Sequence, residues 1–172
     1  VELEKKQYTG VGYRRTRFPG LRYKSYQAVG RQSAQKWSPL HLAGCMLYWA
    51  EGAKSHNGAA VFVNSDARML QLFAKFLRDE LEVDDTIIGL RVTTHDTVPE
   101  NIKLIEQYWL DLLALPAQSL RKGQIKKGND QVKHNVYENG FATISIYRME
   151  LFHHILGAIQ EYGGFDNPDW LF

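Results

Sequence analysis

The sequence predicts an α+β domain in which an antiparallel sheet carries helices on one face. Apolar residues recur at helical spacing in some segments and alternate with polar residues in others, so helices and strands follow one another along the chain. The chain also lacks the glycine-rich turn from strand to helix that marks dinucleotide-binding and phosphate-binding folds. An antiparallel sheet therefore fits the pattern better than a doubly wound parallel one.

Length and composition are typical of a single soluble domain. The chain has 172 residues, of which 44% are hydrophobic, enough for a substantial core. Its longest apolar run lies within residues 40–50 and is shorter than the roughly 20 residues that cross a bilayer. No cleavable leader is recognisable, so we expect a cytoplasmic protein without a membrane partner. The single cysteine, Cys45, excludes an internal disulfide and is expected to be buried.

Positive charge is concentrated at the start of the chain. Residues 1–37 hold nine lysines and arginines against two glutamates, although the whole chain has a net charge of only +2. Aromatic residues lie between these cations, which suits an arm that binds phosphates, but a solvated linker to a preceding domain explains the composition equally well. We therefore divide the chain into a basic arm or linker at 1–37, a domain at 38–164 and a tail at 165–172.

The central helix is predicted between Ser38 and Gly52. Ser38 suits the N-cap, Pro39 suits the first helical position, and Gly52 ends the helix. Almost every residue between them is apolar or small, which indicates a helix surrounded by other elements. Its one charge, Glu51, stands in the last turn, where the helix dipole disfavours a carboxylate. Glu51 therefore needs either solvent or a cation as its partner.

The rest of the chain alternates between helical and extended patterns. A short hairpin is expected to turn at residues 55–58, and Asn64 or Ser65 is expected to cap the helix that follows. The strand at 87–95 has one polar face, with Arg91 and Thr93. The predicted helices cover residues 23–36, 66–81, 99–116 and 150–162, the strands cover 59–64, 87–95 and 141–147, and a basic loop covers 117–139.

Residues 42–52, with the sequence Leu-Ala-Gly-Cys-Met-Leu-Tyr-Trp-Ala-Glu-Gly, resemble the motif of the LAGLIDADG homing endonucleases. The resemblance rests on the Leu-Ala-Gly opening, the apolar helical positions and the acid before the final glycine, with Glu51 in place of the usual aspartate. It spans about residues 38–163. It implies that family's fold, in which an antiparallel saddle-shaped sheet carries helices on one face, and a divalent-metal-dependent DNA endonuclease activity.

The resemblance also implies a homodimer. In the family, two motif helices pack side by side and their terminal acids bind metal at the scissile phosphates; two close carboxylates repel unless a cation neutralises them. Residues 155–164 are only faintly similar to a second copy and are better explained as the terminal helix. A working site would therefore combine two chains, with Mg²⁺ or Mn²⁺ on Glu51 and with Gly44, Leu47 and Tyr48 at the dimer interface.

Candidate DNA contacts lie outside the motif. Lys54 could hold a phosphate or pair with Glu51. Asp66 fits a first-turn acid better than a second metal ligand. The adjacent residues His153 and His154 point in different directions from a helix and are assigned structural roles. The remaining candidates for double-stranded DNA are Arg91, Thr93, Lys122, Lys126, Lys127 and Lys133, each of which could equally be an ordinary exposed residue.

A second function stays open beside the endonuclease. The fold and the dimer interface would also serve a non-catalytic DNA-binding or transcription-regulatory module. The short hairpin favours this alternative, because few of its side chains could reach base edges. The intact pair Glu51 and Gly52 favours the nuclease. An RNA-processing role would use the same basic surface and cannot be separated from these two by sequence.

Overall fold

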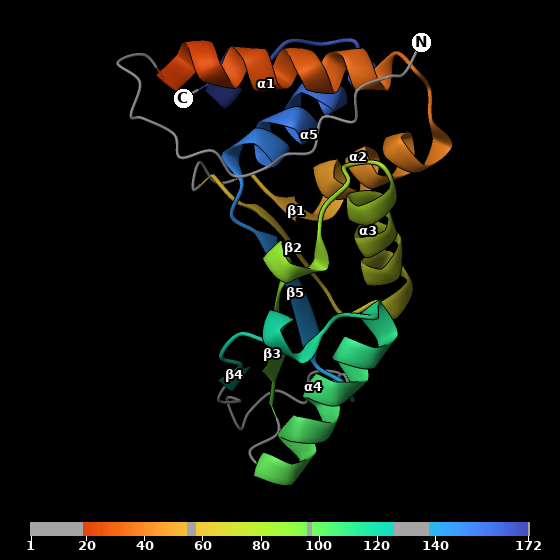
Figure 1. The fold of residues 1–172 in the computed structure, drawn as a ribbon, viewed down its shortest axis with the longest axis vertical. Helices are drawn as coiled ribbons and strands as arrows, with labels where there is room; N and C mark the ends of the chain where they lie inside the picture. The colour runs from red at the N-terminus through yellow and green to blue at the C-terminus, as the bar shows by residue number, and fades with distance from the viewer. Residues whose placement is uncertain (1–18, 55–57, 96–97, 126–137, 172) are drawn as a thin grey trace, which may run out of the picture.

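The computed structural model describes residues 19–54, 58–95, 98–125 and 138–171 (Figure 1). The helices are α1 (Pro19–Ala34), α2 (Pro39–Glu51), α3 (Ala67–Asp79), α4 (Pro99–Leu113) and α5 (Met149–Gly163). The strands are β1 (Gly52–Ala53), β2 (Ala60–Asn64), β3 (Gly89–Thr94), β4 (Gln124–Ile125) and β5 (Phe141–Ile146). The α+β class is confirmed. Among the described helices, none is long and apolar enough to cross a membrane.

The strands form one sheet in the order β1-β2-β5-β3-β4. Neighbours are antiparallel except β3 and β4, which are parallel, so the expected antiparallel sheet is in fact mixed. A parallel neighbour needs a long crossover connection, and α4 provides it between β3 and β4. The backbone N–H of Arg121 donates to the carbonyl oxygen of Leu90 at 2.7 Å and brings the returning chain to the sheet edge.

Helix α1 packs along α5, although the sequence suggested an arm or linker over residues 1–37. Gly30 of α1 lies against the backbone of His154, and Gly157 of α5 lies against the backbone of Gln27. A Cβ atom at either glycine would overlap those backbone atoms, so the missing side chains allow the two helices to approach closely. Residues 19–34 thus belong to the packed domain. Residues 1–18 lie outside the described part of the chain.

The helices α2, α3 and α4 lie on one side of the strands, while α1 and α5 lie across one end of the sheet (Figure 1). The core beneath α2 and α3 is aromatic. The rings of Phe62 and Phe73 stack with centroids 4.5 Å apart, and Tyr48 stacks on Phe73 at 5.8 Å. These three side chains are fully buried. They bind the central helix, the hairpin strand β2 and α3 into one unit.

The N-cap of α3 differs from the expectation. Asp66 is the cap, and its carboxylate accepts hydrogen bonds from the N–H groups of Arg68 and Met69 at 2.7 and 3.3 Å. Asn64 acts one step earlier, because its side-chain oxygen accepts from the N–H of Asp66 at 2.8 Å. Three consecutive polar residues made the choice of cap ambiguous in sequence, since each can accept such a bond.

The C-terminal tail packs back on the domain through aromatic rings. The Phe165 ring lies 5.4 Å from that of Trp49 on α2 and 5.9 Å from that of Trp170. The tail ends in a short 3-10 helix at Pro168–Leu171. It therefore closes over the ends of α2 and α5.

Candidate functional site

The sheet has one face that no described helix covers. Phe62 and Ile144 point to the helices and are fully buried. The register places Val63, Thr143 and Arg91 in one row on the opposite face, where Val63 and Arg91 are exposed and Thr143 is half-buried. We call this the open face. Its residues on the three central strands are Val61, Val63, Gly89, Arg91, Thr93, Phe141, Thr143 and Ser145.

Two arginines lie over the open face. Arg91 is exposed in the middle of β3. The Arg121 side chain lies above Gly89, because a Cβ atom placed on Gly89 would be 3.4 Å from Arg121 Nε. The Arg121 guanidinium donates only to the carbonyl oxygen of Gln118, at 2.8 Å, within the described residues. Positive charge from two different segments therefore gathers on one surface.

These two guanidinium groups differ from those of Arg31 and Arg78. Arg31 pairs with the carboxylates of Glu161 and Asp166, and Arg78 pairs with Asp85 at 2.7 Å. Within the described residues, no carboxylate pairs with Arg91 or Arg121.

The other predicted DNA contacts differ in position and exposure. Thr93 is on the same face as Arg91, but it is only 8% exposed and lies opposite Phe141. Its hydroxyl therefore has little surface to offer a phosphate. Lys122 is exposed and lies two residues before the edge strand β4. Lys126, Lys127 and Lys133 lie outside the described residues.

Arg121 was not singled out in the sequence, although it belongs to the same basic segment as Lys122. In the sequence, only the basic composition of this segment pointed to Arg121. Residues 117–125 read as a loop, and their position beside β3 depends on the parallel pairing of β4 across α4. Without that pairing, nothing distinguished Arg121 from the other cations of the segment.

Glu51 is the last residue of α2 and is exposed. The next residue, Gly52, opens β1 and pairs with Phe62, so Glu51 lies beside the sheet edge near the level of Val63. The Tyr48 hydroxyl donates to the carbonyl oxygen of Ala53 at 2.5 Å and fixes this junction. None of the ion pairs among the described residues includes Glu51.

Lys54 is exposed, and its ammonium group donates to the carbonyl oxygen of Gly52 at 3.1 Å. This contact puts a cation at the C-terminal end of α2, where the free carbonyl groups carry partial negative charge. Lys54 therefore compensates the helix end directly, and its recorded partner is the backbone rather than Glu51.

One chain offers a limited set of metal ligands at this end of α2. Within the described residues, no three His, Cys, Asp or Glu side chains gather as a metal site. Glu51 supplies one carboxylate. Mg²⁺ commonly binds through one or two carboxylates together with waters and substrate phosphates, so Glu51 fits as a partial ligand but does not complete a site by itself.

The residues expected at the dimer interface are mostly used inside the chain. Gly44 lies against the ring of Phe76, where any side chain would overlap, and Tyr48 is fully buried. Leu47 is half-buried. The close approach expected between two copies of the helix is therefore made by α2 and α3 of one chain at Gly44.

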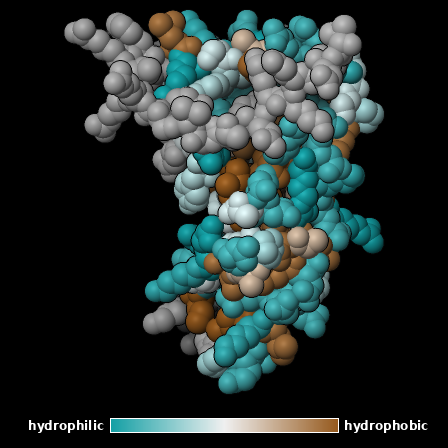
Figure 2. Space-filling model, viewed as in Figure 1, coloured by the Kyte–Doolittle hydropathy of each residue, from teal (hydrophilic) through white to brown (hydrophobic). Residues whose placement is uncertain are grey.

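The opposite side of α2 retains apolar surface. Ala43 and Met46 are half-buried and Ala50 is exposed, and these positions follow one another at helical spacing. Figure 2 shows that hydrophobic side chains also appear elsewhere as patches among a mainly hydrophilic surface. Among the described residues, the exposed or half-buried apolar positions on this side of α2 are thus Ala43, Met46 and Ala50.

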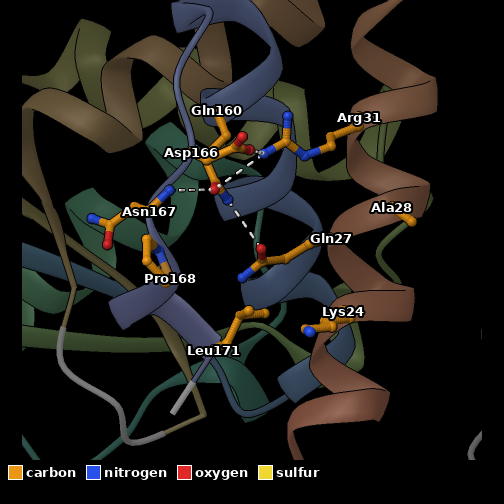
Figure 3. Close-up of a pocket in the computed structure, with 9 residues that line it drawn as sticks. All are labelled: Lys24, Gln27, Ala28, Arg31, Gln160, Asp166, Asn167, Pro168 and Leu171. Carbon is orange, nitrogen blue, oxygen red and sulfur yellow. Dashed lines mark hydrogen bonds and ion pairs between the residues drawn. The ribbon is translucent and has the colours of Figure 1, made fainter.

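A cleft of about 310 Å³ lies between α1, α5 and the tail (Figure 3). Its polar groups bind one another. The Gln160 side chain donates to Gln27 at 3.0 Å and accepts from Arg31 and from the N–H of Asn167, while Arg31 also pairs with Asp166. This network fastens the tail to α1. The cleft is therefore explained as a structural joint.

Comparisons with models of protein families, with curated proteins and with solved structures found no match.

Proposed function

We propose that this protein binds double-stranded DNA across the open face of its sheet and, as a homodimer, hydrolyses phosphodiesters there with Mg²⁺ or Mn²⁺. The observation that carries the proposal is the pair Arg91 and Arg121. Both guanidinium groups lie over a face without a described helix, and neither has a carboxylate partner within the described residues. Arginine's planar group of donors matches phosphate oxygens, and phosphate contacts dominate the affinity of proteins for DNA.

The order of the strands fixes the distance between this cationic surface and Glu51. Arg91 shares a row with Thr143 and Val63, and Glu51 lies near the same level beyond β2. Three strand spacings separate β1 from β3, or about 14 Å. A DNA duplex that contacts Arg91 would therefore be wide enough to extend across this distance to the end of α2.

The two copies would each contribute one Glu51. A divalent ion between two carboxylates removes their repulsion, polarises a phosphate oxygen and lowers the pKa of a bound water. Within the chain, Tyr48 holds the end of α2 against β1 and so fixes where Glu51 is presented. Contact between the copies would use the apolar side of α2 at Ala43, Met46 and Ala50.

A second candidate function is a DNA-binding module without catalysis. It is favoured by the single carboxylate at the end of α2 and by the lack of any three metal-ligating side chains gathered within the described residues. The open face would then bind DNA in the same way, and Glu51 would be a solvated helix-end residue. Binding and cleavage must therefore be measured separately.

The binding experiment is a salt titration with a labelled duplex. Arg91→Gln and Arg121→Gln should each weaken binding and reduce the slope of log affinity against log salt by about 1. Arg68→Gln is the control, because Arg68 is exposed on α3, on the helical side of the sheet. Binding that is absent, or equally weakened by all three substitutions, would reject the open face as the DNA surface.

The cleavage experiment uses supercoiled plasmid with Mg²⁺, Mn²⁺ or EDTA. Metal-dependent nicking that is lost in Glu51→Gln and kept in Glu100→Gln, a control at the exposed start of α4, would support the nuclease. Salt-sensitive DNA binding without nicking in any of the proteins would instead favour the non-catalytic module.

A further inference from the structure

Two buried histidines meet between α2 and α5. His41 Nε2 lies 3.1 Å from His154 Nε2, although the residues are 113 positions apart. His41 is 2% exposed and His154 is 5% exposed. On its other side, His41 Nδ1 lies 2.8 Å from the hydroxyl oxygen of Tyr162. Neither proposed activity uses this cluster.

The two rings meet head-on. Their centroids are 5.4 Å apart, which exceeds the distance between the Nε2 atoms by 2.3 Å, about twice the distance from the centre of an imidazole ring to its edge. Both Nε2 atoms therefore point directly at each other. A zinc ion between them would lie about 1.6 Å from each nitrogen, well short of the roughly 2.0 Å that zinc requires. The contact is thus a hydrogen bond that contains one proton.

Only one of the two facing nitrogens can carry a proton. If His154 Nε2–H donates, His41 accepts at Nε2 and its Nδ1–H donates to Tyr162; if His41 Nε2–H donates, His41 Nδ1 accepts from the Tyr162 hydroxyl. In both arrangements His154 Nδ1 is buried without a hydrogen-bond partner. The neutral pair fits the cluster in either tautomer.

The surroundings offer little compensation for a positive charge. Glu80, at the end of α3, is the carboxylate that acts on His41, and it already accepts from the Ser38 hydroxyl at 2.5 Å. Lys36, before α2, opposes protonation of both histidines. The other titratable neighbours are Tyr162 on α5 and Cys45 on α2, whose thiol lies 4.0 Å from His41 Nδ1. The nearest ring of α3, Phe76, is apolar.

Burial lowers the pKa of both histidines. The pKa of His154 falls to about 4, first because of burial and then because of His41 and Lys36. The pKa of His41 is also lowered, chiefly by burial, while Glu80 partly opposes the shift. An unfolded histidine binds a proton near pH 6.5. The closed arrangement is therefore fully favoured above about pH 6.5 and loses its advantage as the pH falls toward 4.

We propose that the contact between His41 and His154 is a proton-operated latch that holds α2 against α5. The latch is closed while the pair shares one proton between its facing nitrogens. It opens when both imidazoles are protonated, because two N–H groups cannot face each other across 3.1 Å. Opening frees the helix whose last residue is Glu51.

Hydrogen exchange measures the latch directly. After correction for the intrinsic effect of pH, exchange of the amides of residues 39–51 should become about tenfold faster between pH 7.5 and pH 4.5 in the unsubstituted protein. His154→Gln keeps a polar group toward His41 but does not titrate, so the acceleration should fall below about twofold. His95→Gln, at an exposed histidine after β3, should respond like the unsubstituted protein.

Nitrogen chemical shifts of the imidazoles supply a test that needs no substitution. His154 should remain neutral from pH 7.5 through pH 6. Protonation of both His41 and His154 should coincide with the loss of amide protection in α2. Protonation of both histidines with α2 still protected would overturn the latch. An equal response to pH in His154→Gln and in the unsubstituted protein would overturn it as well.

Discussion

The hydroxyl of Tyr48 donates a 2.5 Å hydrogen bond to the carbonyl oxygen of Ala53, across the junction where α2 becomes β1. The hydroxyl oxygen of Tyr48 itself accepts from the N–H of Val61 at 3.4 Å. Tyr48 is fully buried, and its burial raises the pKa of the hydroxyl to about 12, so the group stays protonated and able to donate throughout the physiological range. One side chain thus ties the central helix to both strands of the hairpin and holds Glu51 in place.

Tyr48→Phe tests this tie. It keeps the ring and removes the donor, which leaves the Ala53 carbonyl oxygen unsatisfied, and we expect a loss of about 1–3 kcal/mol in the free energy of unfolding. Urea denaturation measures it. Tyr147→Phe is the control, because Tyr147 is 72% exposed and its substitution should change stability by less than about 0.5 kcal/mol. Equal stability of both variants would contradict the role of the Tyr48 hydroxyl.

The close approach of α1 and α5 depends on Gly30. In Gly30→Ala, the new methyl group would overlap the carbonyl of His154, so we expect destabilisation by about 1–3 kcal/mol as the helices separate. Gly20→Ala is the matched control on the same helix, because its nearest neighbour would be 3.8 Å away. That change should be neutral or stabilise the protein by up to about 1 kcal/mol. Thermal unfolding measures both effects. The midpoint should fall in Gly30→Ala, whereas in Gly20→Ala it should stay unchanged or rise.

The cap of α3 is open to a direct comparison. Asp66→Ala removes the acceptor for two backbone N–H groups and should cost about 0.5–2 kcal/mol in the free energy of unfolding. Ser65→Ala should cost much less, because Asp66 holds the cap position. A larger loss in Ser65→Ala than in Asp66→Ala would show that the helix begins one residue earlier.

Cys45 should be unreactive in the folded protein. The thiol is fully buried, and burial raises its pKa, so the thiolate that reacts with disulfide reagents is suppressed. We expect no release of thionitrobenzoate from Ellman's reagent at pH 8 in native protein and one equivalent after unfolding in guanidinium. Rapid reaction of the native protein would mean that α2 separates from α3 and α5 far more often than this packing suggests.

The sequence predicted the main elements because each depends on local signals. Ser38 and Pro39 define the start of α2, and the side chain of Ser38 accepts from the N–H of His41 as an N-cap does. Strands β1 and β2 pair antiparallel, as in a hairpin, and β5 forms where the alternation indicated. The predicted turn at residues 55–58 lies mostly outside the described residues. The candidate surface was only partly predictable. Arg91 followed from the alternation of β3, whereas Arg121 came to that face through a parallel pairing that no local pattern encodes.

What the sequence alone determined is therefore the type and approximate place of most helices and strands, since caps, turns and periodicity act over a few residues. The boundaries were less exact: α1 begins at Pro19 rather than at residue 23, and β4 lies in a segment expected to be a loop. What only the tertiary structure decided is which side of each element is buried. Helix α2 is apolar nearly all round, so its composition could not show that Gly44 and Tyr48 face inward and that Ala43 and Ala50 do not. The meeting of His41 and His154 likewise depends on the packing of α2 against α5, because contacts between distant residues are fixed by how whole surfaces fit together rather than by their neighbours in the chain.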